Sequence, residues 1–202
     1  IREEAFRAAI NRALRAQQSQ LLALRRSEEA REISRALLGQ LARFLRAAGQ
    51  KRPAGGVPRY RLSLGVRAVG LRGDTLCGDC GTSFQCGVTQ YVLLCDGMGT
   101  GSGAQSDAQE AISVLQSLLT LGFDAMDAAA MLNELYVLRG DGCFSTVDLL
   151  EMDLCTGEGA LYKWGAAPSY LKKGGTVKKI GTASPPPGLG VGEEHRAERV
   201  GL

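Results

Sequence analysis

The hydrophobic pattern divides the chain into a helical N-terminal segment and a mixed remainder. Over residues 1–48, apolar side chains recur every three or four positions in two offset stripes, with no Pro or Gly before Gly39. This spacing predicts one long helix or a helical hairpin, whose apolar face needs a partner because a lone helix cannot bury it. This partner can be the rest of the chain or, in a homodimer, the same segment of a second copy. The stripes comprise Ile10, Leu14, Leu21 and Leu24, then Ile33, Leu37, Leu41 and Phe44.

The remainder alternates between strand and helix patterns. Residues 49–59 are rich in Gly and Pro and are predicted to be a linker. Apolar and polar residues then alternate over Tyr60–Val66, which predicts a half-buried strand. Two later helices are predicted at 103–121 and 124–138, the second capped by Asp124. Further strands are predicted at 83–88, 90–95, 144–154 and 160–165, with a hairpin at 170–179 that turns at Gly174-Gly175. This order indicates an α+β layered fold.

Composition and charge restrict the class of protein. The 202 residues are 45% hydrophobic, as in an ordinary globular chain, and no apolar run approaches the ~18 residues of a membrane span. Residues 1–60 hold 13 Lys and Arg against 5 Asp and Glu, a net of +8, while residues 61–202 hold 11 against 16, a net of −5. We interpret the basic segment as a solvated helix face. Aromatic residues that could stack on bases are almost absent from it, so we expect no nucleic-acid partner.

The six cysteines raise the question of a zinc site. Cys77 and Cys80 form a C-x-x-C pair, but no second pair with ligand spacing follows, and His195 is the single histidine. Cys95 lies in an apolar segment, where a free thiol packs as a small hydrophobic group. We therefore expect reduced thiols in a cytoplasmic protein, or in the cytosolic part of a membrane-anchored one.

The candidate chemistry lies where the apolar segment 91–95 ends in Asp96-Gly97 and a glycine-rich turn. A buried strand that ends in an aspartate fixes the carboxylate at the rim of a sheet, and glycines behind it allow ligands to approach closely. Gly78-Asp79 lies one predicted hairpin upstream. Carboxylate and carbonyl oxygens suit a hard divalent cation. The sequence therefore predicts Asp79 and Asp96 as metal ligands.

These motifs resemble those of the PPM (PP2C-like) metal-dependent serine/threonine phosphatases, and more closely their bacterial SpoIIE-type branch. Besides Gly78-Asp79 and Asp96-Gly97-Met98-Gly99, the resemblance rests on the segments 60–66, 144–149, 164–170 and 187–190, in the family's order. It implies a PP2C-like β-sandwich flanked by helices over residues 60–202, preceded by the long N-terminal helix. The implied activity is hydrolysis of phosphoserine or phosphothreonine on a regulatory protein, by resemblance an anti-sigma-factor antagonist in sporulation signalling.

The resemblance also implies the site. Two Mn²⁺ or Mg²⁺ ions, ~3.5–4 Å apart, would be held by Asp79, Asp96 and the carbonyl of Gly97. A metal-activated water would be the nucleophile, so no catalytic side chain is implied. Asp74 competes with Asp79 for the first position, but the family's order favours Asp79 and leaves Asp74 in a solvated loop. Asp148 receives no metal role and is interpreted as a hydrogen-bonding support of the fold.

The chain differs from the family pattern at its C-terminal end, and two alternative classes of protein remain. The family's further metal aspartates would follow Leu202, so we expect a C-terminally incomplete domain that binds Mn²⁺ weakly and has little activity. One alternative is a catalytically inert regulatory or dimerisation module with the same fold. Another is a dinucleotide-binding domain, since Gly99-x-Gly101-x-x-Ala104 follows a predicted strand. Against the latter, Asp96 would face the pyrophosphate.

Overall fold

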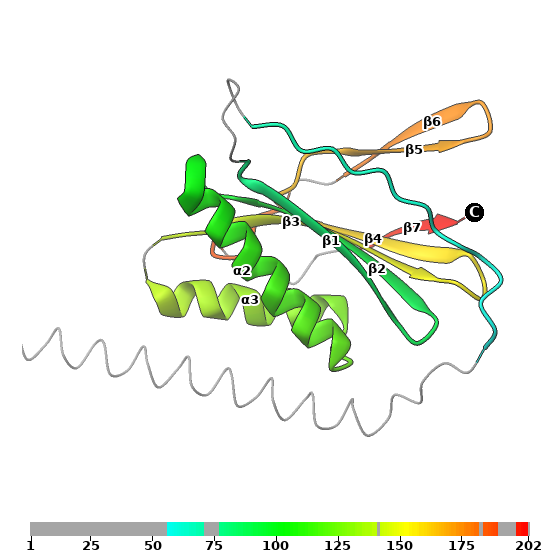
Figure 1. Cartoon of the computed structure of the whole chain (residues 1–202), viewed down its shortest axis with the longest axis horizontal. Helices are drawn as coiled ribbons and strands as arrows, with labels where there is room; N and C mark the ends of the chain where they lie inside the picture. The colour runs from blue at the N-terminus through cyan, green and yellow to red at the C-terminus, as the bar shows by residue number, and fades with distance from the viewer. Residues whose placement is uncertain (1–55, 71–76, 141, 182–183, 190–196, 202) are drawn as a thin grey trace, which may run out of the picture. The chain divides into compact units, whose positions relative to one another are not determined.

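The computed structural model describes residues 56–70, 77–140, 142–181, 184–189 and 197–201 (Figure 1). All of them fall within one compact unit of the chain, residues 43–202. The predicted N-terminal helix over 1–48 and most of the linker lie outside the described residues. Asp74 and His195 lie outside them as well.

A five-stranded antiparallel sheet, in the order β1-β2-β3-β4-β7, forms the centre of the unit. The strands predicted at the places of β1 to β4 are confirmed with shifted bounds, whereas β7 was not predicted. The strands are β1 (Asp79–Cys86), β2 (Thr89–Gly97), β3 (Ser145–Asp153), β4 (Glu158–Trp164) and β7 (Glu198–Gly201). All the strand pairs in the described part of the chain are antiparallel, so that part lacks the parallel βαβ unit that dinucleotide binding requires.

Two helices, α2 (Gly101–Thr120) and α3 (Ala125–Arg139), cover one face of this sheet (Figure 1). Both were predicted. The Asp124 carboxylate accepts a hydrogen bond of 2.8 Å from the backbone N–H of Asp127, which confirms the predicted N-cap. Within the described ranges, no helix is long and apolar enough to cross a membrane.

The hydrophobic core lies between the helices and the facing side of the sheet. Alternate positions of each strand point into it, because side chains along a strand alternate between faces. Its largest members include Leu93, Leu115, Leu132, Leu149 and Trp164, all nearly or fully buried. The intervening positions point to the other face, which carries Asp96 and Asp148 and leaves Leu94 49% exposed. The polar candidates therefore share one face, opposite the core.

A second sheet consists of β5 (Ser169–Lys173) and β6 (Thr176–Ile180). It is the predicted hairpin, and it turns at Gly174-Gly175 as expected. Figure 1 shows it on the side of the five-stranded sheet away from α2 and α3. The described strands and helices thus form the layered α+β arrangement that the sequence predicted.

The predicted strand over Tyr60–Val66 is wrong: residues 56–70 contain neither helix nor strand. The backbone N–H groups of Arg59 and Tyr60 both donate to the Leu154 carbonyl, and no described strand pairs with the residues that follow. Val66 is 82% exposed. An alternating pattern makes a strand only where a hydrogen-bonding neighbour is present, and the described part of the chain offers none here.

Candidate metal centre

Asp79 and Asp96 stand directly opposite each other in the antiparallel register of β1 and β2. Asp79 is the first residue of β1 and Asp96 the last but one of β2, so both lie at the rim of the sheet. Opposing residues have Cβ atoms about 4.5–5.5 Å apart and point to the same face. The hairpin therefore brings together the two carboxylates that the sequence selected.

The pairing leaves an excess of negative charge at this rim. Burial raises the pKa of Asp96 above its usual value, and the neighbouring Asp79 carboxylate raises it further through its charge and a hydrogen bond. A raised pKa means that the ionised form is disfavoured until a proton or a cation compensates it. Because a cation must displace that proton, its affinity for the pair should fall as the pH drops towards the raised pKa.

Gly97 lies under the start of α2 and has no room for a side chain. A Cβ on Gly97 would sit 1.9 Å from the carbonyl oxygen of Ala104. A Cβ on Gly78 would sit 3.6 Å from Asp96 Oδ1 and 3.9 Å from the Gly97 carbonyl oxygen. Those two oxygens therefore border one small space that the absence of a side chain on Gly78 keeps open.

The turn after Asp96 requires backbone angles that glycine adopts more easily than other residues. Gly99 and Gly101 have φ angles of 94° and 77°, in the left-handed region that other residues rarely adopt. The turn lets α2 begin at Gly101, immediately after the rim of the sheet. The glycines that resemble a dinucleotide fingerprint thus serve a strand-to-helix turn.

The donor set fits a hard divalent cation. Asp79 and Asp96 offer carboxylate oxygens and Gly97 a carbonyl oxygen, which are the ligands that Mg²⁺ and Mn²⁺ prefer. Cys80 and Cys95 oppose each other on the core-facing side, and burial raises the pKa of both thiols, that of Cys95 to about 12. Neutral thiols are poor metal ligands. No group of three ligating side chains occurs among the described residues, so water would complete the coordination.

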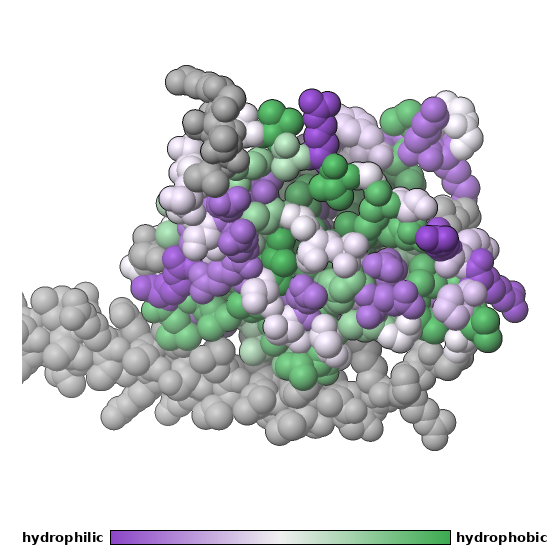
Figure 2. Space-filling view, in the orientation of Figure 1, coloured by the Kyte–Doolittle hydropathy of each residue, from purple (hydrophilic) through white to green (hydrophobic). Residues whose placement is uncertain are grey.

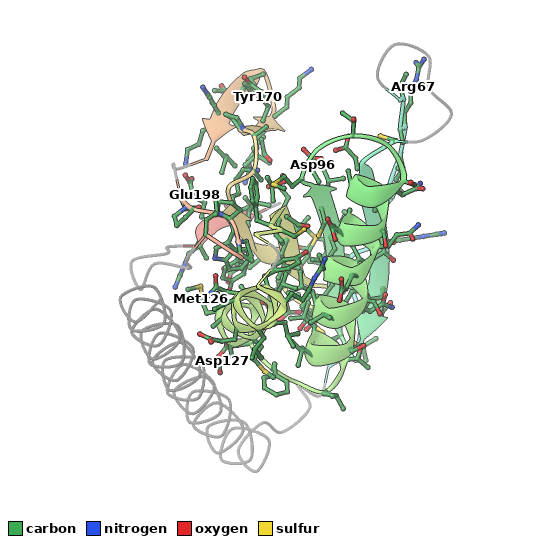
Figure 3. The ribbon with its side chains drawn as sticks, turned by 90° about the vertical axis from the view of Figure 1, so that its left-hand side faces the viewer. Arg67, Asp96, Met126, Asp127, Tyr170 and Glu198 are labelled. Carbon is green, nitrogen blue, oxygen red and sulfur yellow. The ribbon has the colours of Figure 1, made fainter. Side chains whose placement is uncertain are left out.

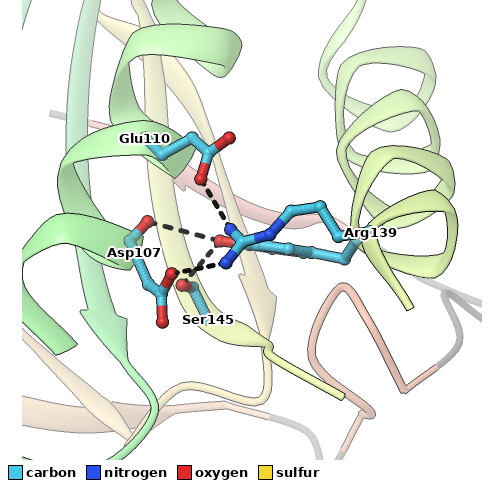
Figure 4. Close-up of polar contacts among 5 residues, drawn as sticks. Asp107, Glu110, Arg139 and Ser145 are labelled. Atoms are coloured by element: carbon cyan, nitrogen blue, oxygen red, sulfur yellow. Dashed lines mark hydrogen bonds and ion pairs between the residues drawn. The ribbon is translucent and has the colours of Figure 1, made fainter. Parts of the chain in front are cut away.

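An ion-pair cluster joins α2 to α3 (Figure 4). Arg139, at the end of α3, contacts Asp107 at 3.1 Å and Glu110 at 2.6 Å, both on α2. Such partly exposed pairs contribute little stability individually. They connect the end of α3 to α2, the helix whose first turn covers Gly97.

A buried hydroxyl pair connects α3 to the strand next to Gly97 (Figure 4). Tyr136 Oη lies 2.7 Å from Ser145 Oγ and donates to the Asp107 carbonyl at 3.3 Å. Burial raises the pKa of Tyr136 to about 12, so the phenol is neutral at ordinary pH. Ser145 is the β3 partner of Gly97. The sequence analysis missed this contact, because nothing in the spacing of Tyr136 and Ser145 links them.

Tyr136→Phe should lower the free energy of unfolding by about 1–2 kcal/mol, because the fully buried Ser145 hydroxyl loses its partner. Urea denaturation measures the change. Tyr170→Phe removes an equivalent hydroxyl from a side chain that is 69% exposed, and it should stay within about 0.5 kcal/mol of the unaltered protein. Equal effects of the two substitutions would show that the buried pair contributes nothing.

On the face that carries Asp96, Lys163 forms an ion pair with Asp148 and donates to Ser169 Oγ at 2.9 Å. Lys163 is only 4% exposed, and burial raises the pKa of Asp148 while the lysine lowers it. The supporting role predicted for Asp148 is confirmed. Lys163 itself was missed, although a lysine and an aspartate at facing positions of adjacent strands were a usable signal.

Comparison with solved structures identifies the class of fold. The structure of the PP2C phosphatase domain with a fragment of the regulatory domain of SpoIIE from Bacillus subtilis matches with a TM-score of 0.65 and 29% identity, over 72% of this chain and 44% of that chain. RsbX in complex with magnesium matches with a TM-score of 0.54 and 13% identity, over 67% of this chain and 65% of that chain. The second match shows the fold alone. The fold is that of PP2C-type phosphatase domains, as the sequence predicted.

Sequence comparison identifies the family. The model described as Stage II sporulation protein E (SpoIIE) matches residues 88–202, and the chain belongs to this family. Stage II sporulation protein E of Bacillus subtilis (strain 168) is 31% identical over 137 residues, which are 67% of this chain and 17% of that protein. The Priestia megaterium protein of the same name is 31% identical over 143 residues, 70% of this chain and 24% of that protein. The chain thus spans less than a quarter of either relative.

Asp96 and Gly97 fall within the family match, and Asp79 precedes it.

Proposed function

We propose that the chain carries the catalytic domain of a PPM-type protein phosphatase, which hydrolyses phosphoserine or phosphothreonine on a regulatory protein. The observation that supports this most is the β1–β2 register, which sets Asp79 opposite Asp96 at the rim of the sheet. Membership of the SpoIIE family, which includes a solved PP2C phosphatase domain, supports it independently.

Each site residue has a separate role in this proposal. The carboxylates of Asp79 and Asp96 and the carbonyl of Gly97 hold Mn²⁺ or Mg²⁺, as two ions. When bound, such ions supply a water of lowered pKa and neutralise charge on the phosphoryl group. Gly78 keeps space beside Asp96 open, and the core-facing thiols stay out of the site. No side chain of the chain acts as the nucleophile.

Hydrolysis of p-nitrophenyl phosphate tests the proposal. In the full-length protein, we expect turnover with Mn²⁺, loss of turnover with EDTA, and recovery when Mn²⁺ is restored. Turnover that persists in EDTA would contradict metal dependence. The inert-module alternative predicts neither hydrolysis nor Mn²⁺ binding in the micromolar to millimolar range.

We propose a phosphorylated anti-sigma-factor antagonist in the cytoplasm as the substrate, because the family's named members are sporulation proteins. The antagonist encoded in the same genome, phosphorylated on its regulatory serine, is the substrate to assay. Dephosphorylation no faster than that of an unrelated phosphoserine peptide would exclude it as the specific substrate.

We further propose residues 1–48 as a regulatory helical segment that forms a homodimer, joined by the linker 49–59 to the phosphatase domain. The support is the two apolar stripes, which need cover. Deleting residues 1–50 should convert a dimer to a monomer in sedimentation experiments. An unaltered monomeric mass, with unaltered kinetics, would contradict this role.

A further inference from the structure

A basic hairpin stands on a domain that is otherwise acidic. Residues 169–180, which include β5 and β6, contain four lysines and no Asp or Glu, whereas residues 61–202 together carry a net charge of −5. Figure 2 shows hydrophilic side chains at the upper right, where Figure 1 places the hairpin. A concentrated positive charge of this kind attracts negatively charged partners.

The register of the hairpin divides its lysines between two faces. Lys173 and Lys178 lie on the inner face, towards β7. There Lys173 donates to the Gly201 carbonyl at 3.3 Å, and Lys178 pairs with Glu198 at 3.1 Å. These two lysines therefore contact β7, and such exposed contacts contribute little stability individually.

The outer face carries Tyr170, Lys172, Val177 and Lys179. Tyr170 stands opposite Lys179, and Lys172 opposite Val177. Tyr170 is 69% exposed and Val177 is 58% exposed. Within the ranges that the structure describes, neither Lys172 nor Lys179 has an ion-pair partner. An exposed tyrosine is typical of protein interfaces. The two lysines add a local positive charge, which attracts acidic partners.

The hairpin rises from the same side of the sheet as the candidate metal centre. Lys163 joins Ser169, the first residue of β5, to Asp148, which shares a sheet face with Asp96. Figure 3 shows Asp96 and Tyr170 on one side of the molecule, away from α3. A partner bound on the outer face of the hairpin would therefore lie on the side where the carboxylates are open.

We infer that the outer face of the hairpin docks the acidic, phosphate-bearing protein on which the site acts. This inference rests on the proposed function. While the phosphate lies at the metal centre, Lys172 and Lys179 complement the acidic residues that flank it. Tyr170 and Val177 supply apolar contact area. The docking face raises the local concentration of substrate at a metal centre that has few side chains of its own to recognise a protein.

The same lysines could attract a nucleic acid, but the surroundings favour a protein. A long polyanion that followed the sheet would meet Asp79 and Asp96, whose charge is already in excess. The basic area spans a single two-stranded hairpin and holds one aromatic side chain, whereas single-stranded nucleic acids bind on grooves with successive aromatic residues. A compact acidic partner fits this area better.

Binding of a fluorescent phosphoserine peptide with flanking acidic residues tests the inference, because anisotropy needs no turnover. Replacing Lys172 and Lys179 together by Gln should raise the Kd at least about tenfold at 0.1 M salt. Replacing Lys173 and Lys178 together by Gln removes the same charge from the inner face and should raise it less than about threefold. Tyr170→Ala should raise it about tenfold.

Each other outcome overturns the inference. Equal effects of the two lysine pairs would reduce the hairpin to nonspecific charge. Tighter binding of a single-stranded oligonucleotide than of the peptide, through the same outer lysines, would assign the face to nucleic acid.

Replacing the outer pair should also lower kcat/KM for the phosphopeptide at least tenfold more than for p-nitrophenyl phosphate, and an equal loss would contradict docking. If neither substrate is hydrolysed, the proposed function fails, and the peptide Kd still decides the docking face.

Discussion

Asp96→Asn should reduce metal-dependent hydrolysis of p-nitrophenyl phosphate by more than about 100-fold, since even outer partners of metal ligands contribute 10–100-fold. The amide keeps the shape of the side chain but removes the charge that holds the cation. The metal-free variant should unfold at the same or a higher temperature, because the neutral amide avoids both the burial of a charge and the repulsion by Asp79, which together raise the pKa of Asp96. Steady-state kinetics at saturating Mn²⁺ and a thermal melt in EDTA measure the two effects.

Asp79→Asn and Asp74→Asn are the matched controls for this prediction. Asp79→Asn should behave as Asp96→Asn does, because the two residues face each other in the sheet. Asp74→Asn should retain activity. Activity that depends on Asp74 and tolerates loss of Asp79 would show that the first ligand was assigned wrongly.

Gly97→Ala should lower the free energy of unfolding by about 1–3 kcal/mol, the usual range for an overfilled site, and should abolish activity. Its Cβ would meet the Ala104 carbonyl oxygen at 1.9 Å, so α2 must move away from β2. That movement would shift the Gly97 carbonyl from its place beside Asp96. Chemical denaturation and the phosphatase assay measure both consequences.

Gly103→Ala is the control for the added methyl group. Gly103 lies in α2, six residues after Gly97 along the chain. A Cβ there would have no atom within 4 Å, and alanine is the better helix former, so stability should rise by about 0.5–1 kcal/mol. Activity should be retained. Equal losses from the two substitutions would show that the close approach of α2 to Gly97 is not the cause.

The sequence predicted the positions of Asp79 and Asp96 at the rim of the sheet, because those positions depend on local features. An apolar segment ending in Asp96-Gly97 defines a strand end, and the glycines after it define a turn. Asp79 required one further step, the pairing of two consecutive strands, which neighbouring strands usually adopt. The alternation within each strand then separated the core from the polar face.

The parts that the sequence did not predict depend on contacts between distant segments. Tyr60–Val66 alternates like a strand but has no hydrogen-bonding neighbour among the described strands. β7 is short and lacks a clear pattern, and its pairing with β4 defines it. Lys163 and Tyr136 act through tertiary contacts, with Ser169 and Ser145, that no local spacing encodes.

We expect divalent cations to bind where Asp79, Asp96 and the carbonyl of Gly97 lie together. Mn²⁺ broadens the amide NMR signals of nuclei close to it, and the test needs no substrate. We predict that millimolar Mn²⁺ broadens the signals of Gly78 and Gly97 first, that EDTA restores them, and that Asp96→Asn prevents the broadening. Broadening that begins elsewhere in the domain, or persists unchanged in Asp96→Asn, would show that the cation binds at another place.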